Sequence, residues 1–288
     1  MKFIDAKSIL SSQNGINLYR GCTHGCIYCD SRSKCYHTPE PFEDIEVKQN
    51  APELLEDALK RKRKKCMIGT GSMCDPYLHA ERELKLTRRC LEIIDRHGFG
   101  VAPLTKSTMI LRDLDLYESI NRKAKVVVQM TMTTFDENLC KILEPNVSST
   151  LERFEALKIF RDRGIDTVVW FCPLCPFIND SLENLEGILG YCKAAGVKGI
   201  INYGMGLTLR EGDREYYYAK LDQYFPGLKQ KYIDTYGWNA YELTSPNAQK
   251  LDRYFKEFCV ENKIITGWDE VFAFMRKFPE RNIQRELF

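Results

Sequence analysis

Short runs of apolar and β-branched residues alternate with longer amphipathic stretches through the first 210 residues of the chain. Val, Ile and Thr favour strands, whereas apolar residues repeated every three or four positions indicate helices. The clearest strand pattern is Lys125–Thr133 (KVVVQMTMT). The other predicted strands are Asn17–Arg20, Cys66–Thr70, Gly100–Thr105, Thr167–Cys172 and Lys198–Tyr203. Strands that alternate with helices in this way predict parallel pairing and right-handed crossovers.

The predicted helices are marked by their apolar faces and by their ends. Ser149 and Glu152 form a capping-box sequence for a helix that ends at Gly164. Asp180 gives a similar start signal for a helix that ends near Gly196. The remaining helices are expected at Pro52–Lys65, Glu81–Arg96 and Leu111–Asn121.

Six β-then-α units are too few for a closed eight-stranded barrel. The sequence therefore predicts an α/β fold with a partial (β/α)6 TIM-type barrel over residues 1–212, whose chemistry lies at the C-terminal ends of the strands. After Gly212 the pattern changes to aromatic-rich helices without strands, so residues 213–283 are expected to form a C-terminal helical extension. Residues 284–288 are expected to form a separate tail.

Composition places the chain among globular proteins of a reducing compartment. Of its 288 residues, 44% are hydrophobic and 28% are charged, which favours a full core over disorder. The net charge of +2 creates no global field that requires a nucleic-acid partner. We expect a cytoplasmic location without a membrane span, because no apolar run is long enough and the N-terminus lacks a signal-peptide core. Twelve cysteines without an export signal predict thiolates on metal and buried thiols.

One segment concentrates the chemistry: Arg20-Gly-Cys22-Thr-His-Gly-Cys26-Ile-Tyr-Cys29. Three thiolates within eight residues can converge on one metal centre. A structural zinc site needs four ligands, usually as two separated pairs, and no second pair is close in sequence. Three cysteines on a [4Fe–4S] cluster leave one iron open for a ligand, so we expect Cys22, Cys26 and Cys29 to bind such a cluster.

The C-x3-C-x2-C spacing, with an aromatic residue before the third cysteine, resembles the radical S-adenosylmethionine (SAM) superfamily. Within it, several sequence segments are similar to the branch that contains spore photoproduct lyase. These segments are NLYRGCTHGCIYC, GTGSMCDPY, LTKS, MTMTTFDE, Glu144-Pro145 and PLCPFIND. The resemblance runs in order from about Tyr19 to about Leu209. It implies that SAM binds the open iron and that one electron cleaves it to methionine and a 5′-deoxyadenosyl radical. It also implies a reductant such as flavodoxin or ferredoxin.

The resemblance assigns roles to three residues around SAM. Tyr28 matches the aromatic residue beside the adenine, although a core aromatic under the loop is the alternative. Lys106 matches a lysine offered to the SAM carboxylate or ribose, with a solvated lysine as the alternative. Thr131 matches a hydroxyl that faces the ribose, although the alternation of a strand also permits Thr133.

The end of the second strand carries the remaining assignments. Gly71, Ser72 and Asp75 match the segment that receives the amino end of SAM. Spore photoproduct lyase has a hydrogen-donating cysteine at the position of Ser72, and Cys74 lies two residues further on. Cys74 is therefore the candidate hydrogen donor, although a buried structural thiol is the favoured alternative.

Two other groups have weaker signals. Cys172 and Cys175 form a C-x2-C pair, for which burial is favoured over a redox or cluster role. Lys60–Lys65 (KRKRKK) is a basic run at a helix end, where it favours the helix dipole and solvation. Phosphate binding is the alternative for this run.

The tail resembles the Q-x-x-L-F peptide by which bacterial repair and replication proteins bind the sliding clamp. Gln284, Leu287 and Phe288 occupy its three positions. An unremarkable terminal segment is the alternative.

The sequence thus predicts a radical SAM enzyme that acts on nucleic acid, in DNA repair or modification. Radical chemistry on a peptide or small molecule is the first alternative, although residues 213–288 have a single cysteine, Cys259, for further clusters. A non-enzymatic Fe–S or zinc module is the second alternative. The segments that resemble a SAM site, which occur in the expected order, count against it.

Overall fold

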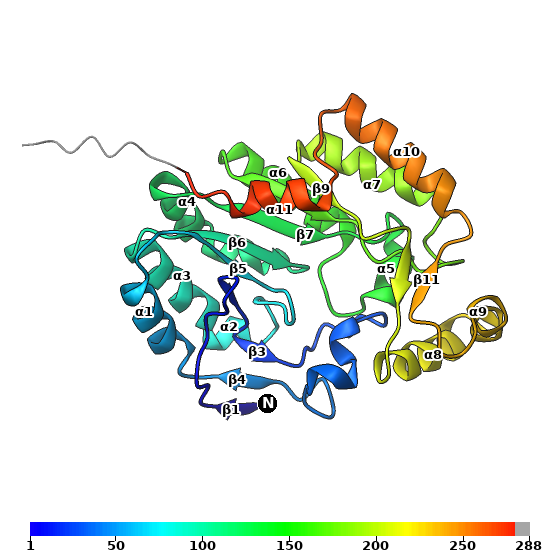
Figure 1. The fold of residues 1–288 in the computed structure, drawn as a ribbon, viewed down its shortest axis with the longest axis horizontal. Coiled ribbons are helices and arrows are strands. Elements are labelled where there is room, and N and C mark those ends of the chain that lie inside the picture. The colour runs from blue at the N-terminus through cyan, green and yellow to red at the C-terminus, as the bar shows by residue number, and fades with distance from the viewer. Residues whose placement is uncertain (280–288) are drawn as a thin grey trace, which may run out of the picture.

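The computed structural model describes residues 1–279. Its main sheet has six parallel strands in the order β2-β5-β6-β7-β8-β9 (Figure 1). The strands are β2 (Gly15–Ile16), β5 (Met67–Thr70), β6 (Gly100–Thr105), β7 (Val127–Thr131), β8 (Asp166–Trp170) and β9 (Gly199–Ile201). The predicted α/β partial barrel is confirmed.

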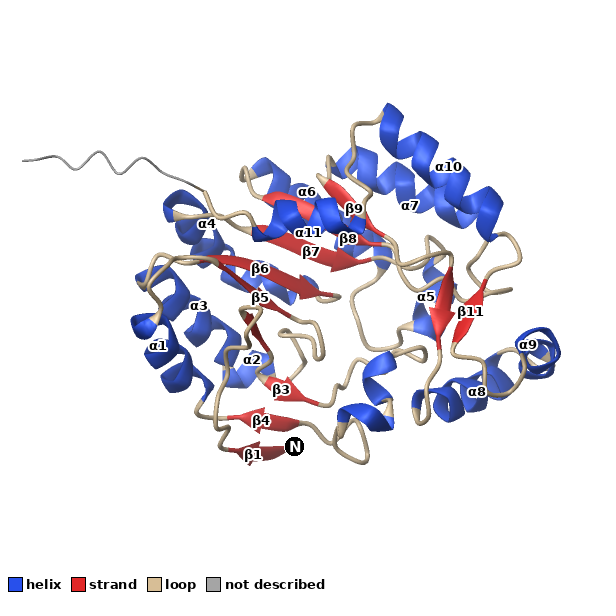
Figure 2. Ribbon diagram, viewed as in Figure 1, coloured by secondary structure: helices blue, strands red, loops and turns tan. Residues whose placement is uncertain are grey.

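Helices cover one face of this sheet (Figure 2). They are α1 (Ala51–Arg61), α3 (Leu86–Arg96), α4 (Leu114–Lys123), α6 (Thr150–Asp162) and α7 (Leu182–Ala195). Successive residues of a strand point to opposite faces, so every second position packs against the helices. The fully buried strand residues on this side include Ile68, Val101, Val128, Met130, Val169 and Ile200.

The opposite face of the sheet has two parts, an apolar layer and a cavity. Near the start of the strands, α11 (Trp268–Arg276) packs through Val271 and Met275 against an apolar cluster. The sheet contributes Met67, Ala102, Val127, Val168 and Ile201 to this cluster. Further along the strands, positions of the same parity line a cavity instead, as described below. A helix from the C-terminal region therefore fills the interior beneath that cavity.

The predicted first strand, Asn17–Arg20, is wrong in its position. The chain leaves the main sheet at Asn17, whose side-chain oxygen accepts from the Met73 backbone N–H at 3.2 Å. Its carbonyl oxygen accepts from Lys48 Nζ at 2.7 Å. With both groups engaged, Asn17 separates β2 from β3 (Tyr19–Arg20). The latter joins a second sheet with β4 (Glu46–Lys48) and β1 (Lys2–Ile4).

Several helix boundaries also differ from expectation, and side-chain contacts account for two of them. The helix predicted at Glu81–Arg96 breaks at Lys85, which has a φ of 48°, into α2 (Glu81–Leu84) and α3. The Glu81 carboxylate accepts from the Thr87 N–H at 2.9 Å across this break. Helix α7 is capped by Ser181, whose hydroxyl accepts from the Asn184 N–H, and not by Asp180. Asp180 accepts a hydrogen bond from the Ser245 hydroxyl instead.

The expectation of a C-terminal region without strands is wrong at one point. β11 (Glu242–Thr244) pairs antiparallel with β10 (Gly206–Thr208). Three residues with a single buried side chain, Leu243, are too few to show a strand period in the sequence. The helices of this region, besides α11, are α8 (Asp213–Tyr224), α9 (Leu228–Tyr236) and α10 (Ala248–Glu261).

The cysteine loop is fixed to the segment that follows α5 (Glu137–Leu143). The Ile27 N–H donates to the Leu143 carbonyl at 2.9 Å, and the Asn146 N–H donates to the His24 carbonyl at 3.1 Å. Gly25 has a φ of 73°, and a Cβ there would lie 3.1 Å from the Asn146 amide nitrogen. Backbone pairing and close approach therefore hold this loop in one position.

A buried ion pair lies beneath the same contact. Glu144 and Arg153 are both fully buried and approach within 2.5 Å. The Tyr28 hydroxyl donates to Glu144, and the Thr133 hydroxyl does so at 3.2 Å. Arg153 also donates to the Thr131 carbonyl at the end of β7. Burial alone disfavours the ionised carboxylate, but Arg153 and Lys106 hold the pKa of Glu144 below its ordinary value.

This pair should be strongly coupled in stability. Loss of one member of a buried ion pair typically costs about 3–5 kcal/mol, because the other charge stays buried without compensation. We expect Glu144→Gln and Arg153→Met each to cost about this much in the free energy of unfolding. The double variant should cost at least about 1 kcal/mol less than their sum. Urea unfolding of the four proteins gives these values.

The exposed pair Lys256–Asp252, at 2.6 Å, is the matched control, and its coupling should stay below about 0.5 kcal/mol. Additive effects at Glu144 and Arg153 would contradict this account of the pair.

Candidate functional site

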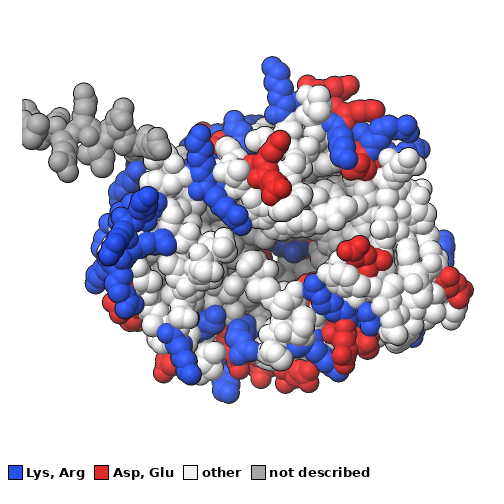
Figure 3. Space-filling view, in the orientation of Figure 1, with Lys and Arg blue, Asp and Glu red and all other residues white. Residues whose placement is uncertain are grey.

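A cavity of about 550 Å³ opens at the C-terminal ends of the strands. Its walls come from the ends of β5 to β9, the cysteine loop and the β10–β11 pair. Figure 3 shows it as a hollow near the centre of the molecule, with a basic side chain inside and few charges around the opening. Among the described residues that line the cavity, Lys106 is the one Lys or Arg.

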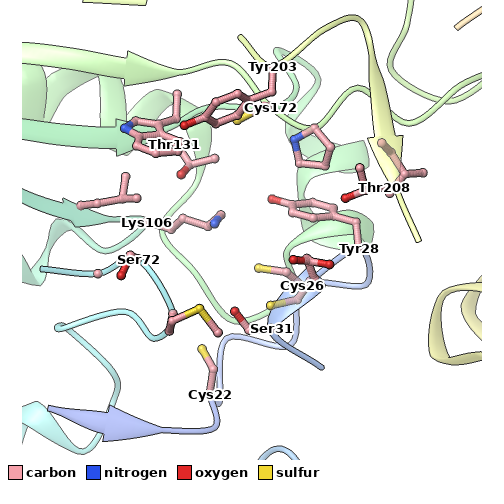
Figure 4. Close-up of a pocket in the computed structure, with 18 of the residues that line it drawn as sticks. Cys22, Cys26, Tyr28, Ser31, Ser72, Lys106, Thr131, Cys172, Tyr203 and Thr208 are labelled. Carbon is pink, nitrogen blue, oxygen red and sulfur yellow. The ribbon is translucent and has the colours of Figure 1, made fainter. Parts of the chain in front are cut away.

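The three cysteines of the motif line this cavity together (Figure 4). A hydrogen bond with Cys74 lowers the pKa of the Cys22 thiol to about 6, while burial raises the pKa values of Cys26 and Cys29. Within residues 1–279, no three His, Cys, Asp or Glu side chains are close enough to share a single metal ion. A [4Fe–4S] cluster does not need that closeness, because each cysteine binds a different iron. The donor set fits a cluster better than a zinc ion.

Lys106 projects into the cavity opposite the cysteines (Figure 4). Its ammonium group lies 5.9 Å from the centre of the Tyr28 ring. Within the described part of the chain it has no hydrogen bond or ion pair. Burial lowers the pKa of Lys106, but Cys26, Glu144 and Cys29 outweigh this effect and raise it above its ordinary value. A cationic group that no acidic side chain of residues 1–279 contacts directly therefore faces the cavity, which suits a carboxylate ligand.

Tyr28 lies between the cavity and the core. Its ring lines the cavity, and its side chain is almost entirely buried. Its hydroxyl is held by Glu144, so the ring cannot turn freely. The adenine contact stays a prediction.

Thr131 and Thr133 are separated by the structure. Thr131 lines the cavity at the end of β7, and the Thr133 hydroxyl donates to Glu144 away from it. Of the two hydroxyls that alternation permitted, Thr131 is the one positioned to meet a ligand.

The segment after β5 is built around Gly71 and Asp75. Gly71 has a φ of 93°, and a Cβ there would lie 2.0 Å from the Leu104 carbonyl oxygen, so only glycine fits. The Asp75 carboxylate accepts from the Thr105 hydroxyl at 2.7 Å and from the N–H groups of Lys106 and Tyr77 at 2.8 Å. These bonds fix Lys106 relative to β5. Asp75 as a direct SAM contact stays a prediction.

Ser72 and Cys74 both line the cavity. The Ser72 hydroxyl accepts from the Asn17 amide at 3.5 Å. The Cys74 thiol is buried and donates to the Gly21 carbonyl at 2.8 Å, next to the cysteine loop. Its hydrogen bond to a backbone oxygen favours the structural alternative for Cys74.

The C-x2-C pair is divided between two environments. Cys175 is fully buried, as expected. Cys172 is half-buried and lines the cavity, so the expectation of burial is wrong for this residue. Thr167–Cys172 was expected to be an apolar strand, but its inward positions beyond Val168 reach past the apolar layer into the cavity.

The sequence reasoning missed the aromatic pair at the cavity mouth. The Trp170 ring packs edge-on against the Tyr203 ring, with centroids 5.7 Å apart. The Trp170 indole N–H donates to Gln129 at 2.8 Å, which fixes the ring. Tyr203 remains 56% exposed. The period of two from Val168 through Trp170 to Cys172 indicates that Trp170 points to the same face of the sheet as Cys172.

The comparisons with known proteins agree with this geometry. The sequence profile of the Radical SAM superfamily matches residues 16–189. The chain is 30% identical over 234 residues to the "Uncharacterized protein Rv2578c" of Mycobacterium tuberculosis, covering 78% of this chain and 68% of that protein. It is 34% identical over 194 residues to the "Uncharacterized protein MJ0683" of Methanocaldococcus jannaschii, covering 67% and 70%.

Solved structures share the fold at low identity. A mutant of spore photoproduct lyase superposes with a TM-score of 0.67 at 14% identity, covering 92% of this chain and 80% of that one. Spore photoproduct lyase complexed with dinucleoside spore photoproduct gives a TM-score of 0.63 at 13% identity, covering 92% and 78%. The family uses a [4Fe–4S] cluster and SAM, and the three cysteines fit that cluster. This chain therefore belongs to the radical SAM superfamily.

Proposed function

We propose that this enzyme uses SAM to modify or repair nucleic acid, with an exposed base entering the cavity. When bound, the cluster supplies the electron that cleaves SAM to methionine and a 5′-deoxyadenosyl radical. The residues of the chain orient SAM, exclude water and hold the substrate at the mouth. The observation that carries the nucleic-acid assignment is the aromatic pair Trp170–Tyr203 at the opening.

The cationic Lys106 is our candidate for the SAM carboxylate, and Tyr28 and Thr131 are our candidates for the adenine and ribose. All three side chains line one cavity with the cysteines. Gly71 and Ser72 form its edge, where the amino end of SAM is proposed to lie. Because Asp75 holds the Lys106 backbone, we give Asp75 a positioning role in addition to its proposed contact.

An aromatic side chain with an exposed face can stack on any nucleobase. Gln129 holds Trp170, so Tyr203 is supported from one side and leaves its other face to a ligand. Spore photoproduct lyase, which shares the fold, has been captured with a dinucleoside photoproduct. Both observations support a base as the group that enters the cavity.

A peptide or small-molecule substrate is the alternative. It is favoured by the lining, in which Lys106 is the single Lys or Arg among residues 1–279 and is already proposed to bind SAM. Phosphates at the mouth would thus have few cationic partners. A test with nucleic acid separates the two proposals.

For the hydrogen donor, Cys74 stays our candidate, although its bond to Gly21 favours a structural role. We also propose a flavodoxin- or ferredoxin-type reductant and a cytoplasmic location. Within residues 1–279, no helix has the length and hydropathy needed to cross a membrane. The proposed clamp contact through Gln284, Leu287 and Phe288 lies outside the described residues.

Lys106→Ala should weaken SAM binding at least about tenfold, because a charge-assisted hydrogen bond contributes about 1.5–3 kcal/mol. Anaerobic calorimetry measures this affinity, and the iron content should not change. Lys141→Ala, at an exposed site on α5, is the control and should bind SAM as the wild type does. Unchanged affinity in Lys106→Ala would make Lys106 an ordinary solvated lysine.

Tyr203→Ala tests the proposed substrate class. Stacking of one base contributes about 1–3 kcal/mol, so binding of a labelled 20-nucleotide single strand should weaken about 5- to 100-fold. Anaerobic fluorescence anisotropy with DNA and RNA strands measures this. Tyr224→Ala removes a ring that is 42% exposed and not part of the cavity, and should have no effect. Failure of the wild type to bind either strand would overturn the nucleic-acid assignment.

A further inference from the structure

The basic run Lys60–Lys65 lies at the opposite end of the sheet from the cavity. Helix α1 ends at Arg61, four residues earlier than the sequence indicated, and Lys62 is its C-cap. The rest of the run forms the loop that enters β5. Figure 3 shows Lys and Arg side chains gathered at the left edge of the face that carries the hollow. Helix α1 lies along the same edge in Figure 1.

The centre of this run carries charges that have no acidic partner in the described part of the chain. Lys62, Arg63 and Lys64 make no ion pair with any residue between 1 and 279. By contrast, four basic side chains nearby have acidic partners within hydrogen-bonding distance, whereas Arg61 donates to the Asp57 carbonyl and Lys65 lies over the Phe99 ring. These pairs are Lys60–Glu56 at 3.1 Å, Arg96–Glu56 at 3.0 Å, Lys123–Asp95 at 2.7 Å and Arg163–Glu118 at 2.5 Å.

The helix dipole accounts for part of the run only. It favours cations in the last turn of α1, where Lys60 and Arg61 lie. Arg63 and Lys64 lie beyond that turn and are exposed. Three adjacent positive charges with like charges on both sides create a local positive potential, which favours an anionic partner.

The surroundings indicate which anion fits. Membrane-binding basic segments carry exposed apolar side chains, and no large exposed hydrophobic residue lies between residues 50 and 100.

An electron donor needs to approach the cluster. From Lys65 to Gly71, at the cavity, the chain rises along β5 by about 20 Å at roughly 3.3 Å per residue. A long polyanion can span that distance, whereas a small docked reductant at the run would be far from the cysteines.

We propose that Lys62, Arg63 and Lys64 bind the phosphate backbone of a nucleic acid whose reacting base occupies the cavity. The inference rests on the proposed function and supplies the phosphate contacts that the cavity mouth lacks. Nucleic-acid strands rise about 3.4 Å per nucleotide, so about six nucleotides separate the two contacts. Short ligands therefore reach the cavity alone, and longer strands reach both sites.

The test compares a triple variant, Lys62→Gln, Arg63→Gln and Lys64→Gln, with the wild type. Anaerobic anisotropy titrations use a labelled dinucleotide and a labelled 20-nucleotide DNA strand over a range of salt concentrations. The control triple variant, Lys158→Gln, Lys229→Gln and Lys256→Gln, removes the same charge from ion-paired lysines. Iron content and SAM binding should be equal in all three proteins.

We expect the variant at the run to bind the 20-mer at least about tenfold more weakly at low salt, with the salt slope reduced by about two. Binding of the dinucleotide should not change, and the control should resemble the wild type. Equal binding and equal slopes would overturn this inference while leaving the proposed function in place. A wild type that binds neither ligand would overturn both. Binding to phosphatidylglycerol vesicles that the run variant loses, with unchanged 20-mer binding, would assign the run to a membrane instead.

Discussion

The buried ion pair between Glu144 and Arg153 joins the parts of the site that the sequence keeps far apart. Glu144 accepts from Tyr28 on the cysteine loop, and Arg153 binds the Thr131 carbonyl at the end of β7. Neither charge can be left alone in the interior, because an unpaired buried charge is costly. The position of the cysteine loop relative to the sheet is therefore coupled to this pair. The cysteines and Lys106 face one another across a cavity because the loop and the strands are held together at this point.

The second constraint on the site is the helix that covers part of the sheet's inner face. Helix α11 takes the layer nearest the strand starts, so the space above it becomes a blind cavity. Trp170 lies between the two layers, touching Phe272 of α11 below and Tyr203 at the mouth. The C-terminal region thus contributes to the floor of the site, and is more than an appended helical unit. A radical formed in such a space meets fewer competing groups than one formed in an open groove.

Periodicity and spacing predicted the barrel because each strand and helix had its own local signal. Gly100–Thr105 matches β6 at both ends, and the capping box at Ser149 begins α6 as expected. The cysteine motif was found from its spacing and Lys106 from the resemblance to a family, and both lie at the edge where consecutive loops of a parallel sheet meet. Resemblance to a family, and not periodicity, supplied the identity of SAM.

The remaining features depended on contacts between distant residues. Nothing local indicates that Asn17 ends one strand by bonding to Met73 and Lys48, or that Asp180 pairs with Ser245. Glu144 and Arg153 are only nine residues apart, but they form an ion pair because both are buried, and the sequence does not show that burial. Tyr203 was predicted to end a strand, and its edge-on contact with Trp170 depends on β8 and β9 lying side by side.

The most direct test of the central claim follows a hydrogen atom from substrate to product. Anaerobically reconstituted enzyme is incubated with SAM, dithionite and perdeuterated DNA, in single-stranded and in ultraviolet-damaged form. A deoxyadenosyl radical that reacts with nucleic acid takes a hydrogen atom from it, so the 5′-deoxyadenosine recovered should contain deuterium by mass spectrometry. The Cys26→Ala protein should form none of this product. SAM cleavage that proceeds in the wild type with no deuterium transfer from any DNA or RNA tested would contradict action on nucleic acid.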